Sequence, residues 1–357
     1  MWDRKPEAPH AYRGPFNPSK TTAPGVEISG HLPMTAKQGK HLAIVRSVGD
    51  GGQATGDHHA GYYYNLTGNV PDITFRTQGH NRRPYPTDAP YIGAVLGQRR
   101  PKHPKLPQVI TLPTKPSRAP YTRPGQFAGR LGLEHDPFYI YGRHEAPLKF
   151  TAPSLTLTEG LDRKRLAERR VFLDAVNNAR AAAEDNPAIA NYTLQQKKAF
   201  ELLNSTATAG AFDIANEPKK VRERYGEHLN GMSMLMARRL VEAGVPFVTV
   251  FWKVGGIKSA LAKKCGSAGG WDTHGNNFNC LKDDLLPRFD QCYSALLEDL
   301  DQRGLLESTL VMLTSEMGRK PKIGDPRSGG VKGAGRDHWT ACQSIVQIGR
   351  ASCRARG

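Results

Sequence analysis

The sequence has no long hydrophobic run. No segment approaches the roughly 20 consecutive apolar residues that a membrane-spanning helix needs, and hydrophobic residues make up only 38% of the chain. The first residues, MWDRKPEAPHAYRGPF, also lack the apolar stretch of a signal peptide. The sequence therefore predicts neither a transmembrane segment nor a secretion signal in the chain as written.

Cysteine is scarce. The chain contains five cysteines, and no two of them form a CxxC pair. Their spacing therefore indicates neither a structural zinc site built from thiolates nor a disulfide framework. With 357 residues, the chain is long enough to bury a hydrophobic core without such cross-links.

Acidic residues are few in comparison with basic ones. Lys and Arg together number 50 and Asp and Glu 33, which gives a net charge of +17. This excess favours anionic partners, namely phosphate or sulfate esters, acidic polysaccharides, nucleic acids or a membrane surface. Much of it lies between residues 81 and 130, where prolines are frequent and no recognition helix is visible. That region is more typical of a solvated surface arm than of a nucleic-acid site, so we do not expect nucleic acid as a partner.

The spacing of apolar residues predicts alternating helices and strands. A long helix is expected over residues 277–303, with a kink at Pro287. We expect residues 247–251 and 309–313 to be neighbouring or near-neighbouring buried strands, with this helix packed on them. Further strands are expected at 42–48 and 107–112, and further helices at 60–68, at 231–243 and, as a pair, between 161 and 209. Such alternation with short links predicts an α/β fold with a largely parallel sheet.

The rest of the chain is less regular. Residues 71–153 are basic and rich in loops, and we interpret them as an insertion in a single domain spanning 1–347. The C-terminal segment QSIVQIGRASCRARG begins as an apolar strand and then turns into Arg, Ser and Cys. We therefore expect residues 348–357 to be a non-native tail with few core contacts. The chain also opens in a proline-rich loop, so we expect the domain to be incomplete at both ends.

Four polar clusters follow the predicted strands. In α/β folds, ligands gather where parallel strands end, because loops converge there and helix N-termini point inward. The clusters are Asp57, His58 and His59 after the first strand, Asp272 and His274 in GGWDTHGNN, Ser315, Glu316 and Arg319 in TSEMGR, and Arg336, Asp337 and His338 in GAGRDHW.

These side chains suit a metal centre. Carboxylates and imidazoles without thiolates bind Zn, Mn and similar divalent ions. Two metal ions roughly 3.5–4 Å apart need about this many ligands, and they can hold both the attacking and the leaving oxygen of an ester displacement. Arg319 and Arg336 could bind a tetrahedral oxyanion through paired hydrogen bonds.

Each cluster also has a plainer interpretation. The histidine pair could cap a helix, and the Asp-x-His sequence could form an Asx-turn with a hydrogen-bonded histidine. The glutamate could be an ordinary ion-pair partner of Arg319, and the final Asp-His pair could lie on the surface. The four clusters together favour a common site more than any one of them does alone.

Three of these motifs together resemble one family. GGWDTHGNN, TSEMGRKPKI and GRDHW resemble the domain-of-unknown-function 1501 (DUF1501) family, a branch of the alkaline-phosphatase and sulfatase superfamily, and the resemblance extends from Trp2 to about Gln347. RGLLESTLVMLTSEMGR is similar to the superfamily strand that ends in Thr-Ser-Asp-His-Gly, and GYYYNLTG to the helix after the nucleophile. The resemblance implies an alkaline-phosphatase-like fold, a three-layer α/β/α sandwich around a mixed, mainly parallel sheet.

The resemblance also implies roles for individual residues. Asp272 and His274 stand where the superfamily places an Asp and a His on one metal ion, and Glu316 stands at the strand-end Asp of the other. His338 stands near the last metal-binding His, and Asp337 beside it completes the candidate ligands. The expected cofactors are two divalent metal ions, with Zn, Mn and Ca as candidates. We expect the ligand tips within about 6 Å of a common centre.

The nucleophile position departs from the superfamily pattern. His58 roughly occupies it, with His59 beside it, where superfamily enzymes use Ser, Thr or a modified Cys. These two histidines are therefore the candidate catalytic residues. We expect a metal-dependent hydrolase of phosphate or sulfate esters, acting on an anionic small molecule or an ester of a polysaccharide. The alternative is a catalytically degenerate protein that binds an anionic glycan or a cell-envelope partner.

Members of the family usually begin with an export signal and a strand whose end carries a metal-binding Asp. This chain starts after that point, at MWDRKPEAP, and its last residues, IGRASCRARG, resemble translated adapter sequence. We therefore expect a gene fragment whose intact product is exported or periplasmic. We also expect the fragment to bind metal more weakly than an intact relative.

Overall fold

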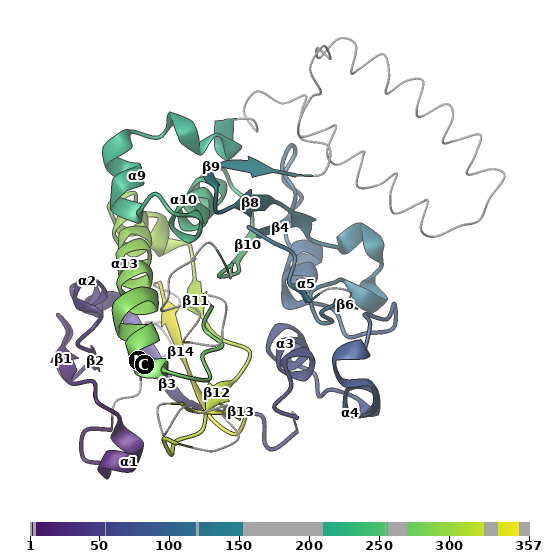
Figure 1. The fold of residues 1–357 in the computed structure, drawn as a ribbon. Helices are drawn as coiled ribbons and strands as arrows, with labels where there is room; N and C mark the ends of the chain where they lie inside the picture. Colours follow the sequence, from purple (N-terminus) through teal and green to yellow (C-terminus); the bar gives the residue numbers. More distant parts are fainter. Residues whose placement is uncertain are drawn as a thin grey trace, which may run out of the picture.

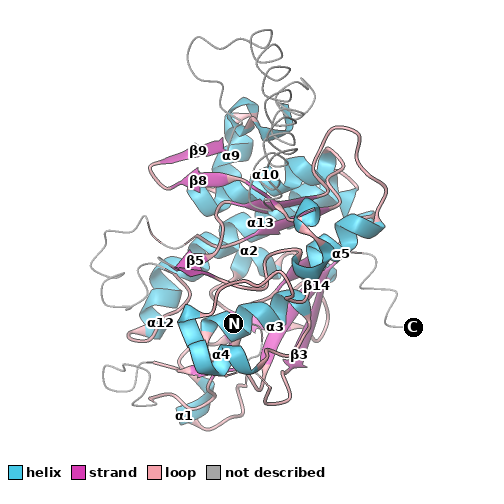
Figure 2. Ribbon diagram, turned by 90° about the vertical axis from the view of Figure 1, so that its right-hand side faces the viewer, coloured by secondary structure: helices cyan, strands magenta, loops and turns pink. Residues whose placement is uncertain are grey.

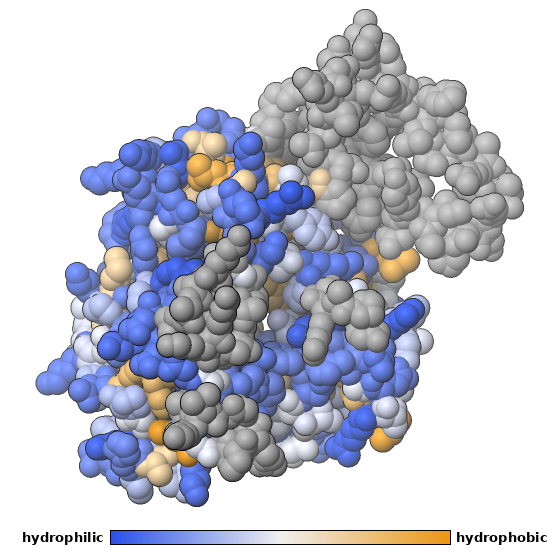
Figure 3. Space-filling view, in the orientation of Figure 1, coloured by the Kyte–Doolittle hydropathy of each residue, from blue (hydrophilic) through white to orange (hydrophobic). Residues whose placement is uncertain are grey.

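The computed structural model describes residues 2, 5–53, 55–118, 121–152, 210–253, 255, 270–324 and 335–349. Within these residues the chain is a mixed α/β structure (Figure 1), and the face seen in that view is mainly hydrophilic (Figure 3). No helix among them is both long and apolar enough to cross a membrane. The helix pair expected between residues 161 and 209, and residues 350–357 of the expected tail, lie outside the described residues.

Helices and strands alternate along the described parts of the chain. The strands are β1 (Pro18–Lys20), β2 (Glu27–Ser29), β3 (Leu42–Val48), β4 (Val109–Leu112), β5 (Ser117–Arg118), β6 (Tyr121–Thr122), β7 (Phe138–Tyr139), β8 (Tyr141–Arg143), β9 (Ala146–Thr151), β10 (Phe247–Val250), β11 (Val311–Leu313), β12 (Gly318–Arg319), β13 (His338–Trp339) and β14 (Gln343–Ile348). The α-helices are α1 (His10–Arg13), α2 (Pro33–Ala36), α3 (His58–Thr67), α4 (Ile73–Gln78), α5 (Ile92–Arg99), α9 (Lys219–Tyr225), α10 (Leu229–Glu242), α12 (Asn277–Cys280) and α13 (Leu286–Gln302). Short helical turns are η1 (Gly39–His41), η2 (Gly79–Asn81), η3 (Gly129–Leu131), η4 (Leu133–His135), η5 (Ile214–Asn216), η6 (Leu281–Leu285) and η7 (Leu305–Glu307). The four strands expected from apolar runs, and the helices expected at 60–68 and 231–243, are confirmed.

A parallel sheet lies between helices. It consists of β10, β4 and β7, with β4 in the centre. Ile110 and Leu112 of β4 pack in the main hydrophobic core with residues of α10, whereas Val109 packs in a second cluster with Ala94 of α5. Because successive strand residues point to opposite faces, helices cover this sheet on both faces. Burial of all four residues of the central strand β4 fits its mostly apolar sequence, VITL.

The second three-stranded sheet is antiparallel. β14 lies between β3 and β11 and is antiparallel to both (Figure 1); β14 and β3 are also labelled in Figure 2. The expectation of one mainly parallel sheet is therefore wrong for the described residues, and β10 and β11 are not neighbours. These two strands are also only partly buried, and Met312 of β11 is 47% exposed. An apolar run marks a strand but specifies neither its direction nor its partner, so the pattern could not arrange them.

The long helix packs beside α10 against the core (Figure 1). α12, η6 and α13 follow one another without a break, as the apolar spacing predicted. At Pro287, where we expected a kink, the chain has a π-helical turn, η6, just before the proline. Proline has no N–H for the preceding turn and its ring crowds a carbonyl there, which a wider turn relieves. Leu285 and Leu286 remain buried, at 1% and 0% exposure, so the wider turn keeps the apolar stripe on the core.

The basic, loop-rich region 71–153 contains more regular structure than expected. It contributes β4 and β7 to the parallel sheet, and all four residues of β4, which lies within 81–130, are buried. Arg82, one of its basic residues, is itself fully buried and donates from Nη1 to Asp88 at 2.6 Å. The expectation of a solvated surface arm over residues 81–130 is therefore wrong. The apolar run VITL is buried despite the prolines and basic residues around it.

Ile348 changes the expected C-terminal boundary. It is the last residue of β14, is fully buried, and is paired with Leu42 and Val311. The prediction of few core contacts is therefore wrong for this residue, because the apolar run QSIVQI extends the strand to its end.

The interpretation of the cysteines also needs a correction, since Cys280 is disulfide-bonded.

Candidate metal centre

Helix α3 begins with the two histidines that the sequence singled out. Asp57 caps it: Oδ1 accepts hydrogen bonds from the main-chain N–H groups of His59 and Ala60, at 2.7 and 3.4 Å. A carboxylate at this position satisfies N–H groups that the first helical turn leaves unpaired. The cap fixes where the helix starts and so places His58 and His59 at its first two positions.

The turn that carries Asp272 is held from several sides. Thr273 is 1% exposed, and its hydroxyl pairs with Oδ1 of Asn277 at 2.5 Å. Arg319 donates from Nη2 to the carbonyl oxygen of Trp271 at 2.9 Å and from Nη1 to that of Thr273 at 3.1 Å. Its Nη2 also lies 3.4 Å from Oδ1 of Asp272. These contacts fix the position of the Asp272 carboxylate, which follows strand β10 in the sequence.

Three imidazoles meet the carboxylate of Asp272. His274 Nε2 and His338 Nε2 each lie 2.8 Å from Oδ1, and His58 Nε2 lies 3.2 Å from Oδ2. The ring centroids of His58 and His338 are 4.8 Å apart, and those of His274 and His338 are 4.9 Å apart. The structure thus brings together four predicted site residues from distant parts of the sequence.

Glu316 joins these residues through His58. Its Oε1 lies 2.7 Å from His58 Nδ1, so both ring nitrogens of His58 face carboxylates. In the described part of the chain the other oxygen of Glu316, Oε2, is buried without a hydrogen-bond partner. We call the five residues His58, Asp272, His274, Glu316 and His338 the Asp272 centre.

Electrostatics in the Asp272 centre follow from these contacts. Burial by itself lowers the pKa of His58, but hydrogen bonds to Asp272 and Glu316 overcome this effect and raise it to about 9. For Asp272 the balance is reversed. Burial raises its pKa, but hydrogen bonds from His338 and His58 outweigh burial and hold that pKa well below its usual range.

His338 is oriented as metal-binding histidines usually are. Its Nδ1 lies 3.0 Å from the carbonyl oxygen of Gly56, to which a ring nitrogen can only donate. In the neutral ring, Nε2 then carries a lone pair, and this nitrogen lies 2.8 Å from Oδ1 of Asp272. Two electron-rich atoms at that distance need a proton or a cation between them. A hydrogen bond from the opposite ring nitrogen to a carbonyl is the usual support of a metal-bound imidazole.

The N–H groups of Arg319 are directed mainly to main-chain carbonyls around Asp272. Its Nη1 and Nη2 donate to the carbonyl oxygens of Thr273, Arg336 and Trp271. Burial lowers the pKa of the guanidinium. We expected Arg319 to bind substrate, but its N–H groups are directed to main-chain carbonyls, because the loop around Asp272 has carbonyls that need donors.

Arg336 and Asp337 point away from the Asp272 centre. Arg336 donates to the carbonyl oxygens of Lys320 and Tyr12, at 3.2 and 2.6 Å. Asp337 Oδ2 pairs with Nζ of Lys320 at 2.9 Å. We expected Arg336 to bind substrate and Asp337 to be a metal ligand. The structure places both side chains apart from the other site residues. Successive residues of an extended segment point to opposite sides, so the neighbour of His338 faces away from it.

His59 also lies outside the Asp272 centre. Consecutive residues on a helix point about 100° apart, so it cannot face the same side as His58. It is fully buried, and its ring centroid lies 5.3 Å from that of His80. One ligand atom from each of Asp57, His59 and His80 lies within 4.8 Å of the others. We call these three residues the Asp57 group. His80 was not predicted, because it stands alone in QGHNRR without a motif around it.

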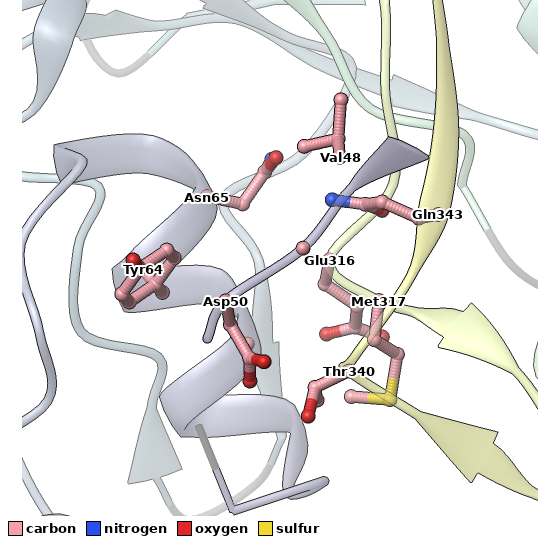
Figure 4. A pocket seen from close by; sticks show the side chains of 10 residues that line it. Val48, Asp50, Tyr64, Asn65, Glu316, Met317, Thr340 and Gln343 are labelled. Carbon is pink, nitrogen blue, oxygen red and sulfur yellow. The ribbon is translucent and has the colours of Figure 1, made fainter. Parts of the chain in front are cut away.

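A cavity of about 170 Å³ lies beside Glu316 (Figure 4). Tyr64 and Asn65 of α3 stand on one side of it, and Glu316, Thr340 and Gln343 on the other. Most of these side chains are polar and can donate or accept hydrogen bonds. The cavity can therefore receive a small polar group next to the Asp272 centre.

The residues of the Asp272 centre fit a divalent metal ion. They offer imidazole nitrogens and carboxylate oxygens, and one subset, His58, Asp272 and His338, has ligand atoms within 4.8 Å of one another. Such mixed donors suit zinc and manganese. A cation would also separate Nε2 of His338 from Asp272 and provide a partner for Oε2 of Glu316.

Residues 1–351 match a family described as "Protein of unknown function (DUF1501)". The match covers nearly the whole chain, so the chain belongs to this family, as its motifs indicated. No curated protein and no solved structure matches the chain.

Proposed function

We propose that this DUF1501 protein is a metal-dependent hydrolase of phosphate or sulfate esters. The observation that carries the proposal is the convergence of His58, His274 and His338 on the carboxylate of Asp272, with contacts of 2.8 to 3.2 Å. The net charge of +17 supports an anionic substrate, either a small molecule or an ester of a polysaccharide.

The ligands divide into two sets. Asp272, His274 and His338 would hold one divalent ion, and Glu316 with His58 would contribute to a second. When bound, such ions withdraw charge from ester oxygens and lower the pKa of a bound water. Arg319 would keep the Asp272 carboxylate in place by binding the carbonyls of its loop. Zinc and manganese suit imidazole ligands better than calcium, which prefers oxygen ligands.

His58 differs from the hydroxyl nucleophiles of the superfamily. Its two ring nitrogens lie 2.7 and 3.2 Å from carboxylate oxygens, so neither is free to attack an ester in this arrangement. A proton on Nδ1 would instead be held against Glu316, which orients the ring and leaves Nε2 toward Asp272. We therefore propose that water, rather than a side chain, attacks the ester.

The cavity beside Glu316 is our proposed place for the polar part of the substrate next to the ester. Asn65, Thr340 and Gln343 in its lining would donate hydrogen bonds to hydroxyl groups of the substrate or accept them.

We also propose an alkaline-phosphatase-like α/β/α sandwich for the complete fold. Helices on both faces of the parallel sheet support this proposal.

The second candidate function is binding of an anionic glycan or a cell-envelope partner without catalysis. Two observations favour it. The residue at the nucleophile position is His58, whose ring nitrogens are both engaged. Met317, which is 8% exposed, follows Glu316 and offers only a thioether, a poor ligand for zinc or manganese.

Hydrolysis assays separate the two candidates. The full chain is stripped with a chelator and assayed on aryl phosphates and aryl sulfates, with Zn²⁺ or Mn²⁺ added back. We expect activity to disappear on chelation and to return with the ion. We expect Asp272→Asn to be inactive and Asp337→Asn, a carboxylate outside the Asp272 centre, to remain active. A metal-loaded protein that binds sulfated polysaccharide but hydrolyses neither ester would support the binding alternative.

A further inference from the structure

The Asp57 group contains a buried histidine whose ring nitrogens form no hydrogen bond with any described residue. His59 is 0% exposed, and both Nδ1 and Nε2 of its ring are buried without a hydrogen-bond partner in the described part of the chain. A neutral imidazole offers one donor and one acceptor. Buried polar groups nearly always have a partner, so an imidazole with none calls for a ligand or ion.

Asp57 and His80 are arranged around this ring. Nε2 of His80 lies 3.1 Å from Oδ2 of Asp57, and the rings of His59 and His80 meet edge to face at 82°. The two oxygens of Asp57 have separate roles. Oδ1 accepts the main-chain hydrogen bonds that cap α3, which leaves Oδ2 to face His80, and one ligand atom of His59 lies within 4.8 Å of those of both residues.

The turn that carries His80 is fixed by its neighbour Arg82. This side chain is 0% exposed and donates to Asp88 at 2.6 Å and to the hydroxyl of Thr74 at 3.1 Å. Its guanidinium also lies over the ring of Phe75, 4.4 Å from the centroid. A buried arginine with this many partners fixes the chain directly after η2, so the main chain that carries the partly exposed His80 side chain is held near Asp57.

We propose that Asp57, His59 and His80 form a second metal site, which binds one transition-metal ion of the zinc type and shares no ligand with the Asp272 centre. Two imidazoles and one carboxylate are a common protein ligand set for zinc, with a fourth position left for water. Calcium and magnesium prefer oxygen ligands throughout, so this site excludes them. An ion here gives the ring of His59 the partner that the protein does not provide.

The place of this site suggests what it does. It links the first turn of α3 to η2, and His58 of the Asp272 centre is the next residue along the chain from Asp57. The ring centroids of His58 and His80 are 6.2 Å apart. The ion therefore positions the start of α3, and with it His58, and takes no part in the chemistry of the first centre.

Zinc titration of the metal-stripped full chain, in competition with a chromogenic chelator, tests this assignment. We expect two classes of zinc site in the wild type. His80→Gln should lose one class and keep the other, and His338→Gln should do the reverse. His135→Gln, which changes a histidine of neither group, should keep both. Far-UV circular dichroism checks that each variant is folded, and Asp57→Asn gives a second test because Asn caps a helix as well as Asp does.

The outcomes separate this inference from the proposed function. If zinc binding by folded His80→Gln and Asp57→Asn equals that of the wild type, the second site does not exist. If the wild type binds one zinc ion and only His338→Gln loses it, the inference is likewise overturned. If only the class that depends on His80 is found, the second site stands and the hydrolase proposal fails. Co²⁺ in place of Zn²⁺ adds a visible absorption spectrum whose loss in His80→Gln supports ligation by that residue.

Discussion

The Asp272 centre and the Asp57 group use the same kinds of side chain in opposite ways. The Asp272 centre gathers residues that lie between positions 58 and 338, and both ring nitrogens of its His58 face carboxylates. The Asp57 group comes from residues 57 to 80, and among the described residues neither ring nitrogen of its His59 has a hydrogen-bond partner. Protons can satisfy the first arrangement when metal is absent, whereas in the second no described residue forms a hydrogen bond with the ring of His59.

This difference has a thermodynamic consequence. An ion that binds the folded chain but not the unfolded one stabilises the fold. In the Asp272 centre the ion competes with protons for His58, so part of its binding free energy is used to displace them. In the Asp57 group it competes with no hydrogen bond of His59. Three sets of substitutions and one pH dependence test the difference between the two groups.

The largest expected effect is on stability near the Asp57 group. Arg82→Met should lower the free energy of unfolding by about 3–5 kcal/mol, because it leaves the buried carboxylate of Asp88 without its ion-pair partner. Urea denaturation monitored by circular dichroism measures the change. The exposed neighbour Arg83 gives the control, since Arg83→Met should change stability by less than about 0.5 kcal/mol. Equal effects of the two substitutions would mean that η2 does not depend on Arg82.

The second effect is a pH dependence of the metal-free protein. The pKa of His58 is raised from 6.5 to about 9 in the folded chain. The stability that this histidine adds is therefore fully present below pH 6.5 and is lost as the pH rises through about 9. The loss is about 1.4 kcal/mol for each unit of pKa difference. Unfolding free energies of the wild type and His58→Gln, measured from pH 6 to pH 10, should converge at the alkaline end. A constant difference over that range would contradict the proposed contacts of His58.

The third effect is on zinc binding and concerns Arg319, which holds the loop of the Asp272 centre but is not itself a proposed metal ligand. Arg319→Lys removes the paired hydrogen bonds to the carbonyls of Trp271 and Thr273 and should weaken zinc binding there by about 10–100-fold. Arg336→Lys is the matched control, because Arg336 also binds main-chain carbonyls but not those around Asp272. Zinc competition titrations compare the two. If both variants bind zinc equally well, the loop does not depend on Arg319.

The smallest effect concerns the cap of α3. Asp57→Asn should change the stability of the metal-free protein by less than about 0.5 kcal/mol, because Asn and Asp are similar N-caps. Asp57→Ala should cost about 1 kcal/mol, because it removes the cap. Thermal unfolding of the metal-free variants distinguishes these results. A large loss of stability in Asp57→Asn would show that the carboxylate charge, and not the cap, holds this part of the fold.

Much of the Asp272 centre could be predicted from the sequence. His58, Asp272, His274 and Glu316 each come after a predicted strand, and strand ends are where loops converge in α/β folds; His338 was found from the resemblance of GRDHW to the family motif. Neighbouring residues were harder. His59 and Asp337 were predicted as site residues because their types suit the site and they adjoin His58 and His338. In a helix and in an extended segment, however, adjacent side chains point in different directions, so both lie outside the Asp272 centre.

The arrangement of strands and the Asp57 group could not be predicted. An apolar run does not encode strand direction, so nothing indicated that β14 lies antiparallel between β3 and β11. His80 has no motif and no periodic neighbours. It reaches Asp57 because η2 lies against α3, with Arg82 tying the end of η2 to Thr74 of α4 and to Asp88, and these tertiary contacts have no local signal.

Zinc binding by Asp272→Asn tests the proposed metal centre most directly. The substitution keeps the size of the side chain but removes the charge that three imidazoles approach. We expect the zinc class that depends on His338 to weaken by more than about 100-fold, since losing a ligand costs more than losing a supporting hydrogen bond, while Asp337→Asn binds zinc as the wild type does. An Asp272→Asn protein that is folded and binds zinc with unchanged stoichiometry and affinity would contradict the existence of a metal centre at Asp272.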